Sequence, residues 1–353
     1  MAESYPELQC VDGGISAELR EQIRTMVDAK YLVDGLSRDR AGRRLLGPLY
    51  DSSGLRHGAE LFRRVFPFAD IDHDGAAFSG LVPTAQTIGA SERWTTRALS
   101  DQERETSLVF LRARERASPA AENHAEYFWI RPLGLFLAHE GKNRVGFFRD
   151  MQVDWIPAWV IPCKYIAADR LSIYRISKER QSPTYWAVLD EEWLEPLEHP
   201  DWALPVLKAY GVQVRRDWPA EFPSLKLTAA ALGDRSCGSI SHRLPALNLP
   251  LVREKNEYES EEVTCSLLDI KGIKVPWRSL LWAGAVSMAA IIAFDALPPA
   301  WLKLRIAAAV VAGAGCAVML LPSLRILRLP RRLVDPYAAQ RKFAGKGLPP
   351  SRW

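Results

Sequence analysis

The sequence predicts an α+β protein that ends in a C-terminal two-helix transmembrane hairpin. Three observations predict this fold class. Apolar residues recur at helical spacing near the N-terminus, short apolar strands alternate with helices in the middle of the chain, and two uncharged apolar runs lie near its end. The 353 residues suffice for about two domains. The net charge of +4 is too small to indicate nucleic-acid binding by itself, and five scattered cysteines without a CxxC pair argue against a disulfide framework or a zinc site.

Residues 1–118 are expected to form a mainly helical N-terminal region. A helical pattern runs from residue 16 to residue 46 and includes a basic stretch, RDRAGRR (38–44), that we interpret as a solvated turn. A short helix is expected at 58–68. Ser100 and Glu103 have the spacing of a capping box, which predicts a helix that begins at residue 101.

The segment DIDHDG, residues 70–75, matches the opening half of a calcium-binding loop. Leu81 stands at the twelfth position, where such a loop needs a bidentate glutamate. We therefore expect no metal site there.

Residues 119–221 are expected to form an α/β domain. Strands at 126–130 and 133–138 precede a polar loop, a short helix follows the loop, and another apolar strand begins at residue 156. Further strands are expected at 171–176 and 185–189, followed by a helix from 199 to 210 that stops at Gly211.

The polar loop EGKNR, residues 140–144, carries the pattern of an anion site. Gly141 lets the backbone approach a ligand closely, and the amide groups at the start of the following helix favour negative charge. Arg144, one turn into that helix, can hold a phosphate or a carboxylate with two parallel hydrogen bonds. Phosphate is the first candidate ligand, and a hairpin turn with a solvated charge cluster is the structural alternative.

This stretch resembles the ParB/sulfiredoxin-like superfamily over residues 127–176. The motif of that superfamily runs from an apolar strand through an acidic or small residue, a glycine, two polar residues and an arginine into a helix, and an IPV-type strand follows. The resemblance implies a ParB-like nucleotide-binding domain with a mixed sheet and flanking helices. Gly141 matches the turn glycine, Arg144 the phosphate-holding arginine and IPAWV (156–160) the later strand. The loop lacks a cysteine, which argues against sulfiredoxin chemistry. It also departs from the GERR form, so the cytidine-triphosphate gate of chromosome-segregation proteins is not implied.

By the same resemblance, the ligand is a nucleoside triphosphate with Mg²⁺. Glu140 is then the catalytic candidate, which orients water or holds the metal. Lys142 and Arg144 neutralise phosphate charge, and Asn143 donates a further hydrogen bond. Three nearby residues are candidates for the wall of the same pocket: Arg131, His139 and Arg149.

Residues 222–275 are expected to be a partly ordered connector, because they are rich in proline, serine and glycine and include the charged run REKNEYESEE (253–262). Short strands are expected around 247–252. The apolar runs 279–294 and 306–321 follow within a hairpin that covers 276–324, and each approaches the length needed to cross the hydrocarbon core of a bilayer. Four small residues are expected to let the two helices approach closely: Gly284, Ala307, Gly313 and Gly315.

Basic residues predict the orientation of the hairpin. More of them flank the two runs (Lys271, Lys274, Arg278, Arg325, Arg328, Arg331, Arg332) than lie in the bend (Lys303, Arg305). The positive-inside rule therefore places both termini in the cytoplasm, and we expect a two-pass protein of the bacterial inner membrane. The basic tail, 325–353, is expected to lie along anionic lipid headgroups, with nucleic acid as an alternative partner.

These patterns leave three functions open. The first is a membrane-anchored cytosolic domain that binds a nucleotide or another phosphorylated ligand; the loop does not distinguish binding from hydrolysis or transfer of phosphate. The second is a catalytically inactive, membrane-tethered scaffold. The third is a DNA-binding, partition-like protein, which requires a helix-turn-helix after the nucleotide domain, where Pro219 and Pro223 interrupt the sequence.

Overall fold

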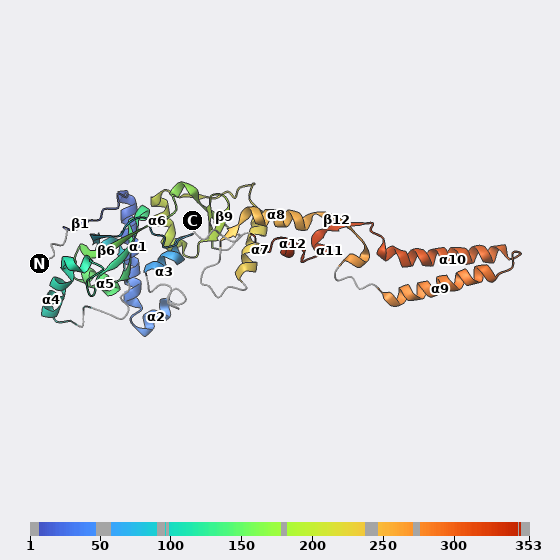
Figure 1. Ribbon diagram of the computed structural model, residues 1–353, viewed down its shortest axis with the longest axis horizontal. Coiled ribbons are helices and arrows are strands. Elements are labelled where there is room, and N and C mark those ends of the chain that lie inside the picture. Colours follow the sequence, from blue (N-terminus) through green and yellow to red (C-terminus); the bar gives the residue numbers. More distant parts are fainter. Residues whose placement is uncertain are drawn as a thin grey trace. The chain divides into compact units, whose positions relative to one another are not determined.

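The computed structural model describes residues 7–46, 58–89, 96, 99–177, 182–236, 246–270, 276–344 and 346. The chain forms two compact units, one that runs to Leu249 and one that begins at Pro250 (Figure 1). Lys271 and Lys274, which contributed to the predicted orientation, lie outside the described residues, as do residues 347–353 of the basic tail.

The first unit contains a mixed six-stranded sheet, sheet A, with the order β1-β2-β6-β4-β5-β3. Its central strand β4 pairs antiparallel with β5 and parallel with β6. The α+β class is thus confirmed, whereas the ParB-like arrangement remains a prediction. The strands of sheet A are β1 (Gln9–Cys10), β2 (Phe78–Pro83), β3 (Thr87–Ile88), β4 (Glu126–Ile130), β5 (Leu135–Glu140) and β6 (Trp155–Cys163).

Both faces of sheet A are covered. Alternation along β5 directs Leu135 and Leu137 into one core, and Phe136 and Ala138 into the other. The first core receives residues of α1 (Ala17–Leu36) and α3 (Gly58–Val65), and the second receives Val145, Phe147 and Phe148 of α5 (Lys142–Asp150). Burial of each such large apolar side chain contributes about 2 kcal/mol.

A second, five-stranded sheet, sheet B, shares the first core. Its strand order is β10-β7-β8-β9-β11, and α6 (Pro200–Tyr210) packs Ala203, Val206 and Leu207 into the same core. Gly211 ends α6 with φ 108°, as the sequence predicts. The strands of sheet B are β7 (Leu171–Ile176), β8 (Thr184–Leu189), β9 (Trp193–Pro196), β10 (Gln213–Arg215) and β11 (Leu247–Asn248).

The predicted capping box is present. The Ser100 side chain accepts a hydrogen bond from the Glu103 amide, and the Glu103 side chain accepts one from the Ser100 amide, at the start of α4 (Asp101–Arg112). The expected turn at 38–44 is wrong, because most of it belongs to the helix α2 (Arg40–Leu46). Residues 78–88, for which the sequence analysis predicts no strand, contribute β2 and β3 to sheet A. β2 contains a glycine and a proline, which weaken its strand signal, and it is held by pairing with β6 over its whole length.

The segment expected to be a connector contains two helices, α7 (Leu225–Ser236) and α8 (Leu249–Ser260). The short strand expected around 247–252 is limited to β11. The charged run belongs largely to α8, because its Lys and Glu residues are good helix formers and its ion pairs have i,i+4 spacing, Arg253 with Glu257 and Lys255 with Glu259.

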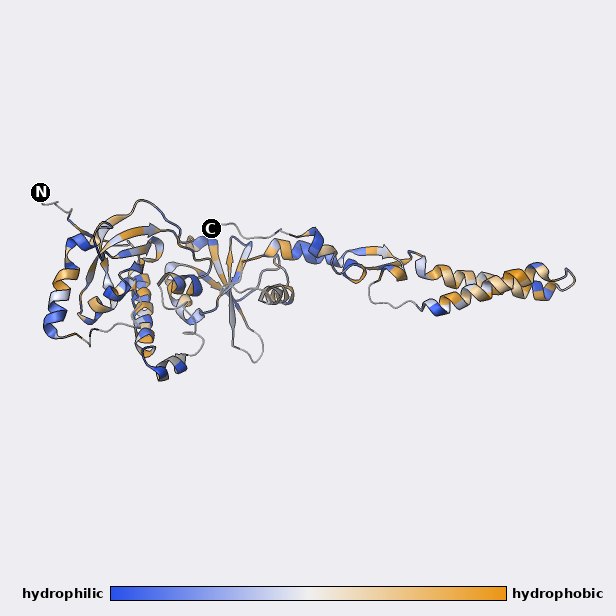
Figure 2. Ribbon diagram, turned by 60° about the horizontal axis from the view of Figure 1, so that its bottom comes forward, coloured by the Kyte–Doolittle hydropathy of each residue, from blue (hydrophilic) through white to orange (hydrophobic). Residues whose placement is uncertain are grey.

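The second unit contains two helices that are long and apolar enough to cross a membrane, α9 (Trp277–Ala296) and α10 (Leu302–Leu320), with the short helix η9 (Leu321–Ser323) after α10. They pack against each other, and Figure 2 shows that both consist mostly of hydrophobic residues. Most of their apolar side chains are exposed. A Cβ on Gly315 would lie 1.8 Å from Ser287 Oγ, and one on Gly284 would lie 2.9 Å from Met319 Sδ, so these two glycines permit the close approach. Gly313 has no atom within 4 Å of the equivalent position and Ala307 is exposed, so they do not take part in it.

A two-stranded ribbon joins the flanks of this hairpin. β12 (Glu262–Cys265) precedes α9, β13 (Leu327–Pro330) follows α10, and the two pair antiparallel. The chain after the ribbon folds into α11 (Arg331–Val334) and α12 (Ala338–Lys342). Phe343 is buried with its ring centroid 5.9 Å from that of Tyr258 on α8. This part of the basic tail is therefore folded.

Candidate functional site

The predicted loop has the local form that its sequence indicates. β5 ends at Glu140, Gly141 adopts the left-handed conformation with φ 74°, and α5 begins at Lys142. Gly141 is the N-cap residue and supplies no side chain to the first amides of the helix. A Cβ at this position would lie 3.3 Å from the Cα of Ala125, so the loop packs tightly against the start of β4.

Arg144 is directed into the protein and is only 6% exposed. Its Nη2 donates a hydrogen bond to the carbonyl oxygen of Asn123 at 2.5 Å. Its Nε and Nη1 are buried, and neither has a hydrogen-bond partner among the described residues. Because a buried donor without an acceptor costs about 1–3 kcal/mol, more when charged, these two N–H groups favour binding of an acceptor.

Two further polar side chains lie near this guanidinium, and we refer to Arg116, Tyr127 and Arg144 as the Arg144 cluster. Within the described part of the chain, Arg116 Nε and the Tyr127 hydroxyl are also buried without a hydrogen-bond partner. Arg116 Nη1 donates to the carbonyl oxygen of Glu122, and its guanidinium lies 3.8 Å from the ring centroid of Phe110. The cluster therefore offers several buried donors from three different elements.

The electrostatics of the cluster favour an anion. Burial lowers the pKa of Arg144, the electrostatic interaction with Tyr127 opposes that effect, and the neighbouring charge of Arg116 adds to it. Burial also raises the pKa of Tyr127, so its hydroxyl stays protonated and can donate. An arginine keeps its charge in proteins, so two positive charges share one buried region. A phosphate or carboxylate would reduce the repulsion between the two arginines and accept hydrogen bonds from their unpaired N–H groups.

The other loop residues lie on the outer side. Glu140 and Asn143 are exposed and Lys142 is half-buried, so the structure separates them from the interior guanidinium of Arg144. Glu140 stands opposite Glu126 in the ladder of β4 and β5. Two carboxylates together with phosphate oxygens are a usual way to hold Mg²⁺. No group of three or more His, Cys, Asp or Glu side chains in the described ranges is arranged to hold a metal ion alone, so any Mg²⁺ here would depend on ligand phosphates.

The three residues expected in the pocket wall do not join the cluster. Arg131 follows the far end of β4, where it pairs with Asp74 at 3.4 Å. His139 is exposed, with its ring centroid 5.1 Å from that of Phe128. Asp74, the last aspartate of the DIDHDG segment, pairs with Arg131 and also with Lys164 at 4.0 Å.

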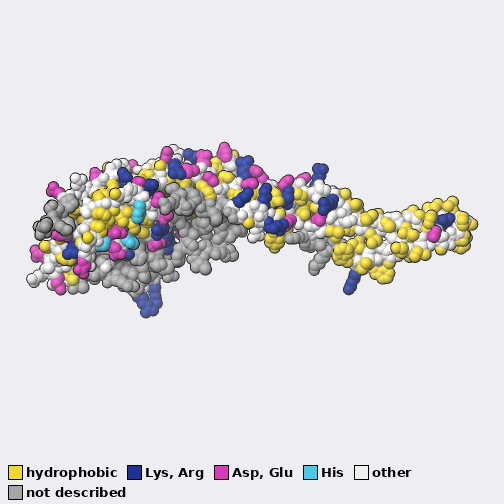
Figure 3. Space-filling model, viewed as in Figure 1, with side chains coloured by type: hydrophobic (Ala, Val, Ile, Leu, Met, Phe, Trp, Pro, Cys, Tyr) yellow, Lys and Arg dark blue, Asp and Glu magenta, His cyan; other side chains and the backbone are white. Residues whose placement is uncertain are grey.

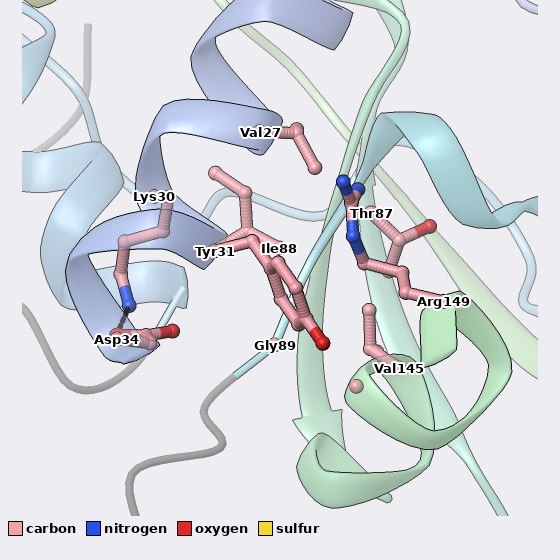
Figure 4. Close-up of a pocket in the computed structure, with 10 residues that line it drawn as sticks. Val27, Lys30, Tyr31, Asp34, Thr87, Ile88, Gly89, Val145 and Arg149 are labelled. Carbon is pink, nitrogen blue, oxygen red and sulfur yellow. Dashed lines mark hydrogen bonds and ion pairs between the residues drawn. The ribbon is translucent and has the colours of Figure 1, made fainter. Parts of the chain in front are cut away.

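Arg149 lines a separate, small pocket between α1, β3 and α5 (Figure 4). It pairs with Asp28 and lies 4.8 Å from the ring centroid of Tyr31, whose hydroxyl donates to Asp150. The buried ion pair of Lys30 and Asp34 borders the same pocket. Its volume of about 10 Å³ leaves room for roughly one water molecule, so this pocket cannot admit a nucleotide. The ion pair of Arg149 with Asp28 and the hydrogen bond from Tyr31 to Asp150 join α1 to α5.

Sequence reasoning missed three residues near the loop: Arg116, Glu126 and Tyr127. Alternation in β4 was a signal that Tyr127 faces inward, as Ala138 and Phe136 do on β5. No local pattern connects Arg116 with Arg144, because the two residues belong to different elements that only the fold brings together.

Comparison of the chain with protein-family models, with curated proteins and with solved structures finds no match. The resemblance to the ParB/sulfiredoxin-like superfamily therefore stays a prediction that rests on the loop and its flanking strands.

Proposed function

We propose that this protein is a membrane-anchored binding protein whose first unit holds a phosphorylated ligand, with a nucleotide as the first candidate, at the Arg144 cluster. One observation carries the proposal: the buried guanidinium of Arg144 has two N–H groups without acceptors and lies beside a second arginine. A group that binds two guanidinium ions and accepts several hydrogen bonds is most simply a phosphate.

Each residue then has a distinct role. Arg144 Nε and Nη1 bind two phosphate oxygens, Arg116 adds charge, and the Tyr127 hydroxyl donates a further hydrogen bond. Lys142, on the loop surface, neutralises a second phosphate. Glu140, with Glu126 opposite, holds Mg²⁺ when a nucleoside triphosphate is bound. These roles account for binding of the ligand alone. Hydrolysis of a bound triphosphate would be tested separately, by measuring the release of phosphate.

The second unit is proposed to anchor the protein in a bacterial inner membrane with both termini in the cytoplasm. The exposed apolar surface of α9 and α10 supports insertion, because water would hydrate it unfavourably. The basic residues after α10 outnumber those in the bend, which supports the orientation.

The test uses the full-length protein in neutral detergent, with its thermal unfolding followed in the presence of inorganic phosphate and of each nucleoside triphosphate with and without Mg²⁺. A ligand at about 100 times its Kd stabilises the folded state by about 2.7 kcal/mol, which raises the Tm. The variant Arg144→Lys keeps the charge but loses the two-pronged geometry, so we expect affinity to fall about tenfold or more. Arg149→Lys, the same change on the same helix, is the matched control and should retain the ligand-dependent shift.

One observation favours a scaffold without a ligand. The hydrogen bond from Arg144 Nη2 to Asn123 ties the segment before β4 to α5, which is a structural role for the arginine. In that case Arg144→Lys would lower the Tm of the unliganded protein, and no phosphate compound would shift the Tm of the wild type. That pair of results would contradict the ligand-binding proposal.

A further inference from the structure

The second unit contains an open pocket of about 890 Å³ beside the ribbon that closes the hairpin. Residues of α8, β12, α11 and α12 line it, together with Asp269 and with Arg325 before β13, and none of its lining residues belongs to the helices α9 and α10. Lys and Arg side chains gather at this end of the hairpin in Figure 3. The pocket therefore opens in a charged region that directly adjoins the two apolar helices.

The lining carries an excess of positive charge. Four cationic side chains face it, Arg325, Arg331, Arg341 and Lys342, against the carboxylates of Asp269 and Asp335. Two of the cations are already matched, because Arg331 pairs with Glu261 at 2.7 Å and Arg341 pairs with Asp335. In the stretch that the structure describes after α10, neither Arg325 nor Lys342 has a carboxylate within 4.0 Å, although Arg325 interacts at longer range with Asp269. These two cations remain available to an anion.

Two further side chains in the pocket lining, Asp269 and Tyr258, interact with these cations. Hydrogen bonds from Ser266 lower the pKa of Asp269, and the charge of Arg325 lowers it further, so this carboxylate stays ionised. Two cations contact the ring of Tyr258, with Arg331 at 4.2 Å and Lys342 at 4.1 Å from its centroid. Tyr258 thus fixes the position of Lys342 at the pocket without neutralising it.

The surroundings of Arg325 identify the source of the anion. Leu324 and Ile326, its neighbours in the chain, are 46% and 65% exposed, and the residue follows η9 by only two positions. A cation between exposed apolar side chains, immediately after a membrane-crossing helix, lies at headgroup depth. The anion within its reach is a lipid phosphate.

We propose that this pocket binds the phosphate headgroup of an anionic phospholipid, with Arg325 and Lys342 as its free cationic contacts. The proposal rests on insertion of the hairpin in a bilayer. This lipid site differs from the basic tail that the sequence analysis expects along the membrane surface. The lipid phosphate lies in a defined pocket, and other basic residues of the same segment do not line that pocket.

The test compares two double variants of the full-length protein with equal loss of charge. Arg325→Gln with Lys342→Gln removes the two free cations of the pocket, whereas Arg328→Gln with Arg332→Gln removes two exposed cations of the same segment that do not line it. Binding of phosphatidylglycerol and of phosphatidylcholine is measured by native mass spectrometry in neutral detergent, and soluble glycerol 3-phosphate serves as the second anion. Thermal unfolding shows whether each variant is folded, and resistance of the membrane-bound protein to alkaline carbonate extraction reports insertion.

We expect selective binding of phosphatidylglycerol by the wild type and the control pair, and affinity lower by about tenfold or more in the pocket pair. Equal loss in both pairs would show that only the overall charge matters and would overturn the proposal. Equally tight binding of glycerol 3-phosphate would identify a site for soluble phosphates instead. Extraction of the wild type by carbonate would refute the anchor and the lipid site together, whereas insertion without lipid selectivity would refute the lipid site alone. If the pocket pair unfolds, the charge-preserving pair Arg325→Lys with Lys342→Arg decides, because it should retain binding.

Discussion

Arg144 occupies the third position of a nine-residue helix, yet its guanidinium contacts a carbonyl group 21 residues earlier in the chain. A surface arginine gains little from one such hydrogen bond, because water competes for it. Here burial removes the competing water, so both the bond to Asn123 and the absence of acceptors at Nε and Nη1 have larger energetic consequences. The same burial makes the side chain costly in the free protein, and under the proposed function an anion would offset that cost.

Asp190 illustrates a charge whose effect on stability depends on pH. It lies in the turn after β8 with φ 51°, and Arg170 donates to it at 2.9 and 2.5 Å. These hydrogen bonds lower the pKa of Asp190 below its ordinary value of 3.8. A lowered pKa in the folded state gives stability that is present above the unfolded value and is lost as the pH falls through the folded value.

We therefore predict that Asp190→Asn lowers the stability of the full-length protein at pH 7 by less than about 1 kcal/mol, since the pair is partly exposed. Asparagine tolerates the left-handed backbone, so the change tests the charge. The difference from the wild type should shrink as the pH falls below the ordinary value of 3.8 and vanish once the pH lies below the lowered pKa of the folded protein. Thermal unfolding across this range measures it, and Asp169→Asn, which removes a charge beside Arg170 without a hydrogen bond, should show a smaller effect. A difference that persists unchanged at low pH would disprove the assignment.

At the scale of elements, the hairpin depends on small residues at its seam. Ser287, Ala290 and Ala312 are its buried residues, and Gly315 faces Ser287 directly. In a membrane the hydrophobic effect does not drive helix association, so close packing of this kind has to supply the attraction. The seam explains why two glycines separated by only one residue, Gly313 and Gly315, have different roles.

We predict that Gly315→Ala destabilises the hairpin by about 1–3 kcal/mol, because the added methyl group overlaps Ser287 and approaches the carbonyl of Ala283. Gly313→Ala adds the same methyl group where no atom lies within 4 Å and should be neutral or slightly stabilising. Thermal unfolding of the full-length protein in detergent, followed by far-ultraviolet circular dichroism, distinguishes the two. Equal effects of both substitutions would show that the seam is elsewhere.

At the scale of the whole molecule, the chain combines a unit with two packed cores and a unit whose longest helices bury almost nothing. Pairing of β12 with β13 brings the start of α9 and the end of α10 to the same end of the hairpin. Both flanks must then lie on the same side of any bilayer that the hairpin crosses.

Labelling of single cysteines tests this arrangement in right-side-out bacterial membrane vesicles. We predict that Pro299→Cys, in the bend, reacts with a membrane-impermeant maleimide from outside. Gln340→Cys, in α12, should react only after the vesicles are opened, because the positive-inside rule keeps the basic flank in the cytoplasm. Labelling of both sites in intact vesicles would show that the hairpin does not cross the membrane.

Local signals in the sequence predicted many elements closely. The capping box at Ser100, the glycine stop at Gly211 and the glycine before α5 each act within about one turn of chain, so they can be recognised without the fold. The helices in 222–275 were missed because proline and serine obscured a pattern of i,i+4 ion pairs, and β2 was missed because its stability comes from β6.

The sequence by itself determined that a glycine turn leads from a strand into a helix that carries an arginine, and that two apolar runs lie near the end of the chain, because both depend only on neighbouring residues. The tertiary structure alone decided that the arginine turns inward, that Arg116 and Tyr127 accompany it, and that Arg131, His139 and Arg149 do not. It also decided that the basic segment after α10 folds around a pocket. Such contacts join residues far apart in the chain, and their energies depend on burial, which no local pattern of residues specifies.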